Sequence, residues 1–273
     1  MKETIYNLDG ILIVAVLFLC MLISVEIGFH SRGRGRAKAG TVEAVAQANA
    51  ILVAMLGLLS LLLAFTFSAA LQRFDDRSLA VVTEANAIGT TYLRGQLLPA
   101  QMRDEVQSLL RQYLDLRIRE GQVDFTDEAT RRDLLDQAGQ IEAQLWRHAA
   151  RAAEQDGGPV TSGLFIQSLN DLIDASAARA AANGRHVPEI VILLLFVTVL
   201  ISTVMIGFAS GIAGHRPTFG ALVLMVLIVL VVYLIIDLDR PRRGAIQVSQ
   251  ESLLILQRTI ATELEQRIPQ SVP

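Results

Sequence analysis

The stretch AILVAMLGLLSLLLAFTFSAALQRFDDR, residues 50–77, decides the fold. Its part from Ala50 to Leu71 carries no charged side chain and has the length of about 20 residues that a helix needs to cross hydrocarbon. Continuous rather than alternating hydrophobicity indicates a helix. Charged residues follow from Arg73 on, but no proline interrupts the chain before Pro99. We therefore predict one unbroken helix from about residue 50 to beyond residue 90, half in the membrane and half a stalk in water.

Three more apolar runs, residues 11–29, 190–213 and 219–236, have the same character. The chain is 52% hydrophobic with a mean hydropathy of +0.44, which is high for an ordinary soluble domain. No small-x-small cleavage pattern follows the first run, so we interpret it as a retained span rather than a secretory signal. Only Gly214 to Thr218 separate the last two runs, which predicts a tight hairpin. The sequence thus predicts four transmembrane helices.

Between the second and third spans, the composition is that of a soluble helical protein. Pro99, Thr126 and Thr161 mark helix starts, and Gly121 and Gly157 mark helix ends. Apolar residues recur at steps of three and four, without a convincing strand pattern. A further amphipathic helix follows the last span. The expected fold is an all-α polytopic membrane protein in four parts: residues 1–71 with spans one and two, a water-facing helical domain over 72–187, a transmembrane hairpin over 188–238, and a C-terminal tail over 239–273.

The orientation in the membrane follows from arginine and lysine. The loop between the first two spans contains four basic residues and no acid: Arg32, Arg34, Arg36 and Lys38. By the positive-inside rule this loop is cytoplasmic. Arg240, Arg242 and Arg243 at the opposite membrane end argue against it. With more weight on the first span, we expect the helical domain and both termini outside the cytoplasm, in a bacterial inner (plasma) membrane.

Two charged clusters lie where helices leave the membrane on the same side. The first contains Arg73, Asp75, Asp76 and Arg77, and the second Asp237, Asp239 and Arg240. Charges at such a boundary cost less free energy when paired, so we expect salt bridges between Arg73 or Arg77 and Asp237 or Asp239. The alternative is that they are ordinary interfacial charges that end helices. Glu26, one turn before His30, is either a functional ionisable residue within a span or an interfacial carboxylate paired with His30.

Two spans carry small residues at steps of three and four. In the second span these are Ala50, Ala54, Gly57, Ser60, Ala64 and Ser68, and in the third Thr203, Gly207 and Gly211. Such stripes typically allow close helix packing. The alternative is that Ser60, Thr66 and Ser68 line an oligomeric pore. Of the two, we favour packing for the stripe, with any pore near Thr66 and Ser68.

Three strings of residues prompt a family resemblance. They are Phe65-Thr66-Phe67-Ser68 running into Arg73-Phe74-Asp75, then Glu84-Ala85-Asn86-Ala87-Ile88-Gly89-Thr90, and finally Leu238-Asp239-Arg240-Pro241 with Val248-Ser249-Gln250. Over nearly its whole length the chain resembles the bacterial bestrophin-like domain family, which is considered related to chloride channels. The resemblance implies a multi-pass membrane protein, with channel activity by distant analogy.

Motifs of known enzyme chemistry are absent from the sequence. It has no phosphate-binding glycine loop, no Gly-x-Ser-x-Gly and no His-Glu-x-x-His. The four histidines lie far apart, so no catalytic, cofactor or metal site is expected. A net charge of −3 and 5% aromatic residues argue against nucleic acid as a partner. The single cysteine, Cys20, excludes an intrachain disulfide.

Two functions remain open. The first is an oligomeric ion channel, with the bilayer, further copies of the chain and chloride ions as partners. It requires oligomers, because side chains fill the interior of a four-helix subunit. The second is a non-conducting membrane scaffold or sensor whose helical domain binds a partner or a ligand.

Overall fold

The computed structural model describes residues 9–31, 41–123, 127–240 and 246–267. Within these ranges every regular element is a helix. The elements are α1 (Gly10–Ser31), α2 (Val42–Arg94), the 3-10 turn η2 (Gly95–Leu97), α3 (Ala100–Gln122), α4 (Glu128–Gln155), α5 (Ser162–Asn183), α6 (Glu189–Ile212), α7 (Phe219–Asp239) and α8 (Glu251–Arg267). The predicted all-α class is confirmed. The start signal at Thr126 and the basic residues of 32–40 and 241–245 lie outside the described residues.

The chain forms two compact units. We call the first, residues 1–73, 186–240 and 244–246, the membrane unit, and the second, residues 74–185, 241–243 and 247–273, the water-facing unit, after the domain that the sequence predicts. Four helices are long and apolar enough to cross a membrane, namely α1, the first part of α2, α6 and α7. These are the four predicted spans. Residues 239–273, expected as a separate tail, divide between the two units.

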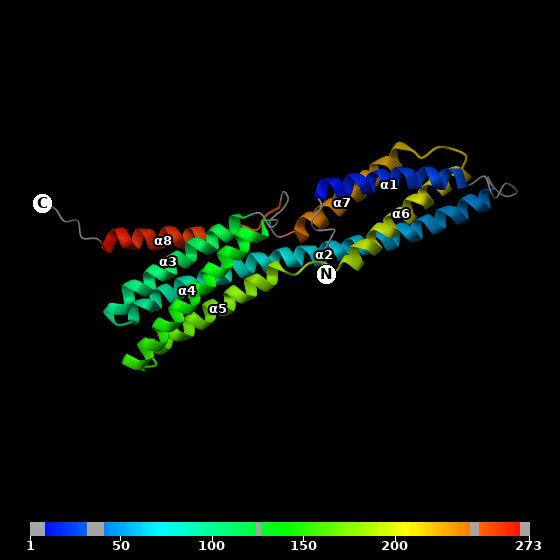
Figure 1. Ribbon diagram of the computed structural model, residues 1–273. Coiled ribbons are helices and arrows are strands. Elements are labelled where there is room, and N and C mark those ends of the chain that lie inside the picture. Colours follow the sequence, from blue (N-terminus) through cyan, green and yellow to red (C-terminus); the bar gives the residue numbers. More distant parts are fainter. Residues whose placement is uncertain (1–8, 32–40, 124–126, 241–245, 268–273) are drawn as a thin grey trace. The chain divides into compact units, whose positions relative to one another are not determined.

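Helices α1 and α6 hold the membrane unit together (Figure 1). They cross where Gly28 of α1 faces Gly207 of α6. A Cβ atom at Gly28 would collide with the carbonyl oxygen of Val204, and a Cβ atom at Gly207 with that of Val25. The two backbones are therefore in direct contact, as glycine allows in membrane helices. Helix α7 also packs against α1.

Helix α2 runs without a break from Val42 to Arg94, as predicted. No proline removes a backbone hydrogen bond within it, and the predicted stalk is its second half. The turn η2 follows α2 and ends at Leu97, because proline favours an extended residue before it, and Leu98 is extended with φ −73° and ψ 158°. Pro99 itself caps α3, so it lies one residue before the helix rather than in its first turn.

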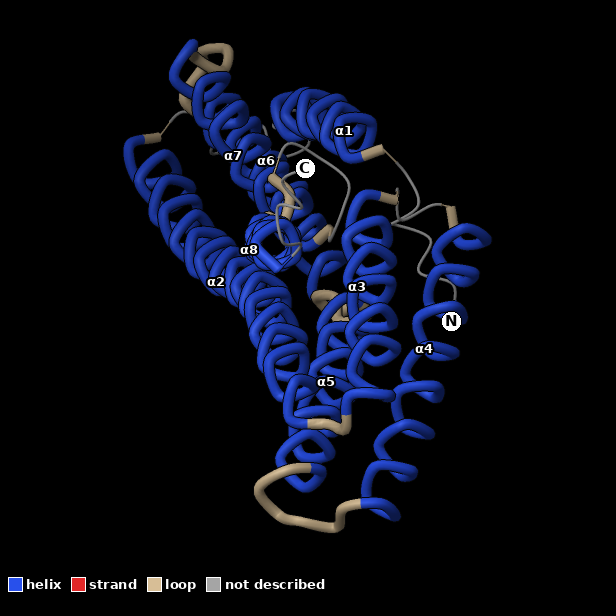
Figure 2. Tube along the Cα trace, turned by 90° about the vertical axis from the view of Figure 1, so that its left-hand side faces the viewer, coloured by secondary structure: helices blue, strands red, loops and turns tan. Residues whose placement is uncertain are grey.

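The water-facing unit is a helical bundle. Helices α3, α4 and α5 lie alongside one another (Figure 2). The Asp127 carboxylate caps α4 by accepting a hydrogen bond of 3.1 Å from the Thr130 amide. Helix α8 contributes Leu253 and Ile260 to the same hydrophobic core, so its apolar face belongs to the bundle. Other fully buried core residues are Ile88, Val106, Leu110, Tyr113, Leu145, Phe165, Leu169 and Leu172.

Candidate functional site: helix α2 and the charges around it

The second span presents a face of small residues away from the chain's own helices. Only 11% of the most apolar stretch of α2 is buried, against 28–39% in the other three spans. Its small residues Ala54, Gly57, Ser60, Ala64 and Ser68 are all exposed. A methyl group added at Gly57 would meet no heavy atom within 4 Å. This face of α2 is therefore open to something other than the described part of the chain.

Thr66 lies on the opposite face of α2. Its side chain is buried, and its hydroxyl donates a 2.7 Å hydrogen bond to the Leu62 carbonyl oxygen. Successive residues are rotated by about 100° around the helix axis, so two residues that are two positions apart lie on nearly opposite sides of the helix. Thr66 thus does not share a face with Ser68, although both were candidates for the same pore lining.

The small residues of α6 have a different environment. Gly207 contacts the backbone of α1, and Gly211 is buried. Thr203 is also buried, with its hydroxyl 2.8 Å from the Leu200 carbonyl oxygen. This stripe is used for packing within the chain. Its partner Gly28 was missed in the sequence, because a lone glycine near the end of a span has no periodic signal.

The carboxylates at the end of α7 bind backbone amides. Both oxygens of the buried Asp239 lie 3.0–3.1 Å from the Val187 nitrogen. The His186 ring nitrogen Nδ1 lies 3.1 Å from the carbonyl oxygen of Asp239. The Ile246 amide donates a 2.9 Å hydrogen bond to Asp237. Together, Asp237 and Asp239 anchor the chain before α6 and after α7 to the end of α7.

The residues of the first charged cluster lie on different faces of α2 and therefore differ in burial. Arg77 is buried, and its guanidinium donates a 2.7 Å hydrogen bond to the carbonyl oxygen of Arg185, just after α5. Arg73 is half-buried, whereas Asp75 and Asp76 are exposed. Pairing of Arg73 or Arg77 with Asp237 or Asp239 stays a prediction. Reversing the charge of one partner should lower the folded yield, and reversing the charge of the other as well should restore it.

The other sequence candidates at the membrane boundary differ in exposure. Glu26 and His30 lie 3.5 Å apart, and both side chains are more than half exposed. Arg240, by contrast, is buried. Among the described residues, no group of three or more histidine, cysteine or acidic side chains is arranged to hold a metal ion.

Four buried charged side chains form a cluster in the water-facing unit. Glu84 of α2 is completely buried, and its two carboxylate oxygens each lie 2.5 Å from a guanidinium nitrogen, one of Arg117 and one of Arg179. Glu120 lies 3.4 Å from Arg179 and 3.7 Å from Arg117. Arg179 also donates a 2.9 Å hydrogen bond to Gln250, just before α8. Two acids and two bases thus join α2, α3, α5 and the start of α8.

Burial and charge act on the titratable groups of this cluster. Burial, followed by the Glu84 charge, raises the pKa of Tyr113, whose hydroxyl lies 3.3 Å from the Glu84 carboxylate. Burial alone would lower the pKa of Arg117, but the neighbouring Glu84 raises it above its usual range. The guanidinium groups of Arg117 and Arg179 therefore supply charged hydrogen-bond donors that offset the free-energy cost of removing the Glu84 carboxylate from water.

This cluster was not predicted from the sequence. A signal for it exists, because Glu84 falls at helical spacing among the inward-facing residues Val81, Ile88 and Tyr92 of α2. An acid at a core position needs a basic partner. Which arginine supplies the charge depends on the packing of three helices, which is not visible from spacing.

The chain is similar to known proteins over most of its length. The family model of the Bestrophin-like domain matches residues 14–253. The chain belongs to the bestrophin-like family. Two of the residues that carried the resemblance in the sequence, Glu84 and Gln250, meet through Arg179 in the buried cluster. No curated protein matches the chain at a significant level.

Solved structures show the same fold. A bacterial bestrophin homologue from Klebsiella pneumoniae matches with a TM-score of 0.66 at 18% identity, over 92% of this chain and 97% of that chain. A point mutant of the same homologue has a TM-score of 0.68 at 17% identity, covering 94% and 98%. A crystal structure described only as that of a mutated membrane protein has a TM-score of 0.61 at 17% identity, covering 93% and 97%.

Proposed function

We propose that this bestrophin-like protein is an oligomeric ion channel that conducts anions such as chloride. The observation that carries the proposal is the exposed, uncharged small-residue face of α2, which is the least buried of the four spans. Close approach between membrane helices needs small residues, and the described chain leaves this face uncovered. Further copies of the chain are the occupants that we propose for it.

A conduit within one subunit is not compatible with its interior. Leu59 of α2, Val199 of α6 and Val232 of α7 are buried apolar side chains that fill it. The path therefore lies between subunits. We propose that the Gly57 region packs against a neighbouring copy and that Ser68, at the charged end of the span, lines the path. Selectivity for anions rests on the family resemblance.

The central experiment measures subunit number and ion flux on the same purified sample. Native mass spectrometry gives the number of copies, and chloride efflux from loaded liposomes gives conduction. We expect an oligomer with chloride flux that exceeds flux through empty liposomes and through liposomes with an unrelated four-span protein. An oligomer without flux of any ion would favour the alternative, a scaffold or sensor whose water-facing unit binds a partner.

Localisation is a separate proposal. We place the protein in a bacterial inner membrane, with the water-facing unit outside the cytoplasm, on the four basic residues between the first two spans. A cytoplasm-active and a periplasm-active reporter fused in turn after Arg267 test it. Activity of the periplasmic reporter alone is the expected result, and activity of the cytoplasmic reporter alone reverses the orientation.

A further inference from the structure

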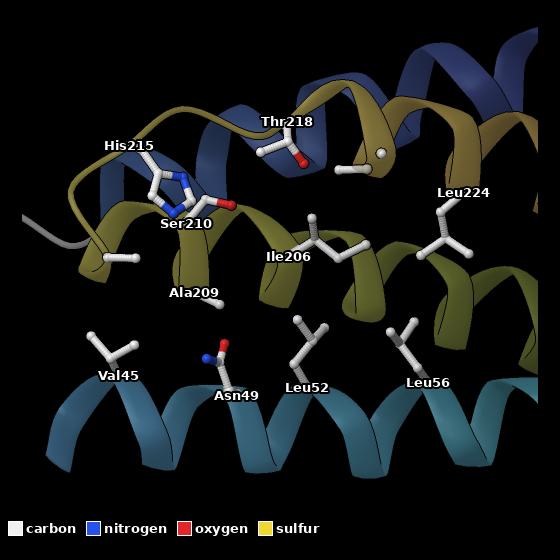
Figure 3. Close-up of a pocket in the computed structure, with 13 residues that line it drawn as sticks. Val45, Asn49, Leu52, Leu56, Ile206, Ala209, Ser210, His215, Thr218 and Leu224 are labelled. Atoms are coloured by element: carbon white, nitrogen blue, oxygen red, sulfur yellow. The ribbon is translucent and has the colours of Figure 1, made fainter. Parts of the chain in front are cut away.

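A cavity of about 390 Å³ opens in the membrane unit between α2, the end of α6 and the start of α7 (Figure 3). Its volume is in the range of small-molecule sites. It lies at the membrane end where α2 and α7 begin and α6 ends, which is the end away from the exposed Ser68. The proposed conduction path does not explain it.

One end of the cavity is polar. In Figure 3 the His215 ring lies over Ser210, and Asn49 points from α2 toward α6. Thr218, which precedes α7, completes this polar end. Within the described part of the chain, the side chains of Asn49, Ser210 and Thr218 make no hydrogen bond. They are donors and acceptors available to a ligand.

The other end is apolar. Leu52 and Leu56 of α2 face Ile206 of α6 and Leu224 of α7 across it (Figure 3). The gradient from polar to apolar runs along the helices, and thus from the membrane boundary toward its interior. A ligand that fits has a polar head and a hydrocarbon chain in that order, which is the construction of a membrane lipid.

The charges nearby favour an anionic head. Arg216 is next to His215 and exposed, with its guanidinium over the Phe29 ring at 5.9 Å. Basic residues beside a membrane attract anionic lipid at about 1 kcal/mol each.

We propose that this cavity is a binding site for an anionic phospholipid. The phosphate group accepts hydrogen bonds from Asn49, Ser210 and Thr218, and one acyl chain lies along Leu52, Leu56 and Leu224. Arg216, next to His215, supplies the preference for negative charge. Bound at the edge of α2, the lipid fills the space between this helix and the α6–α7 hairpin.

The test offers phosphatidylglycerol and phosphatidylethanolamine with identical acyl chains to the full-length protein. Native mass spectrometry then counts the lipid that remains bound. We expect phosphatidylglycerol to be retained at least fivefold over phosphatidylethanolamine. Equal retention of both lipids would overturn the proposal.

Variants place the binding in the cavity. Ala213→Trp fills the cavity from an exposed lining position and should abolish the excess of phosphatidylglycerol. Asn49→Leu removes the polar group on α2 and should reduce the excess at least threefold. Leu227→Trp, on a part of α7 that does not line the cavity and is 54% exposed, is the matched control and should retain it.

Each other result overturns the assignment. Unchanged retention in both Ala213→Trp and Asn49→Leu would mean that the lipid binds elsewhere. A change in the number of subunits in Ala213→Trp, with the lipid preference intact, would make the cavity a contact between copies instead of a lipid site.

Discussion

Helices α2 and α6 carry similar stripes of small residues but use them in opposite ways. Gly207 of α6 lies against the backbone of α1, whereas Gly57 of α2 has no neighbour within 4 Å of an added methyl group. The inward face of α2 differs again, since it carries the fully buried Glu84. A small-residue stripe thus shows that a close approach is possible, and the rest of the chain decides whether it occurs within a subunit.

The largest effect is expected on the inward face of α2. Replacing Glu84 with Ala leaves Arg117 and Arg179 buried without their main partner, and breaking a buried ion pair in this way costs about 3–5 kcal/mol. The midpoint of thermal unfolding in detergent should fall sharply. Asp76→Ala, on the exposed side of the same helix, is the control and should leave the midpoint unchanged. Equal unfolding midpoints for the two variants would show that the buried cluster does not stabilise the protein.

A smaller but still large effect is expected in α6. Gly207→Leu forces α1 and α6 apart, because the added side chain meets the carbonyl group of Val25. Inserting bulk into a packed core costs about 1–3 kcal/mol and sometimes more. Folded yield and the unfolding midpoint should both decrease. A variant as stable as the parent would show that the two helices can separate freely.

The end of α7 offers an intermediate case. In Asp239→Ala the Val187 amide loses both carboxylate contacts, and leaving a buried donor unsatisfied costs about 1–3 kcal/mol. Asp239→Asn keeps one acceptor oxygen and should lose less. We expect the highest unfolding midpoint for the parent, a lower one for Asp239→Asn and the lowest for Asp239→Ala. The reverse order of the two variants would contradict the amide-anchor interpretation.

The smallest effect on the single subunit is expected at Gly57. Gly57→Leu adds bulk on an open face, so the subunit should remain folded with little change in unfolding midpoint. If the face packs against another copy, the oligomer should dissociate, as measured by native mass spectrometry. A variant that keeps its oligomer size but loses chloride flux would instead place Gly57 in the conduction path and overturn the packing assignment.

The sequence by itself determined the elements that depend on local patterns. Uninterrupted hydrophobicity located the four spans, and the absence of proline before Pro99 predicted the unbroken α2. The inward face of α2 could also be anticipated from spacing. The amphipathic pattern of residues 253–264 predicted α8, although it did not show that this helix joins the core of the bundle.

Only the tertiary structure decided which residues meet. Gly28 and Gly207 are far apart in sequence and touch because α1 and α6 cross there. Glu84 has Arg117 and Arg179 as partners through the packing of three helices. Hydrophobicity and helical period are properties of a short segment, whereas a partner depends on the positions of distant segments. For that reason the sequence predicted the helices of this protein, and the packing determined their contacts.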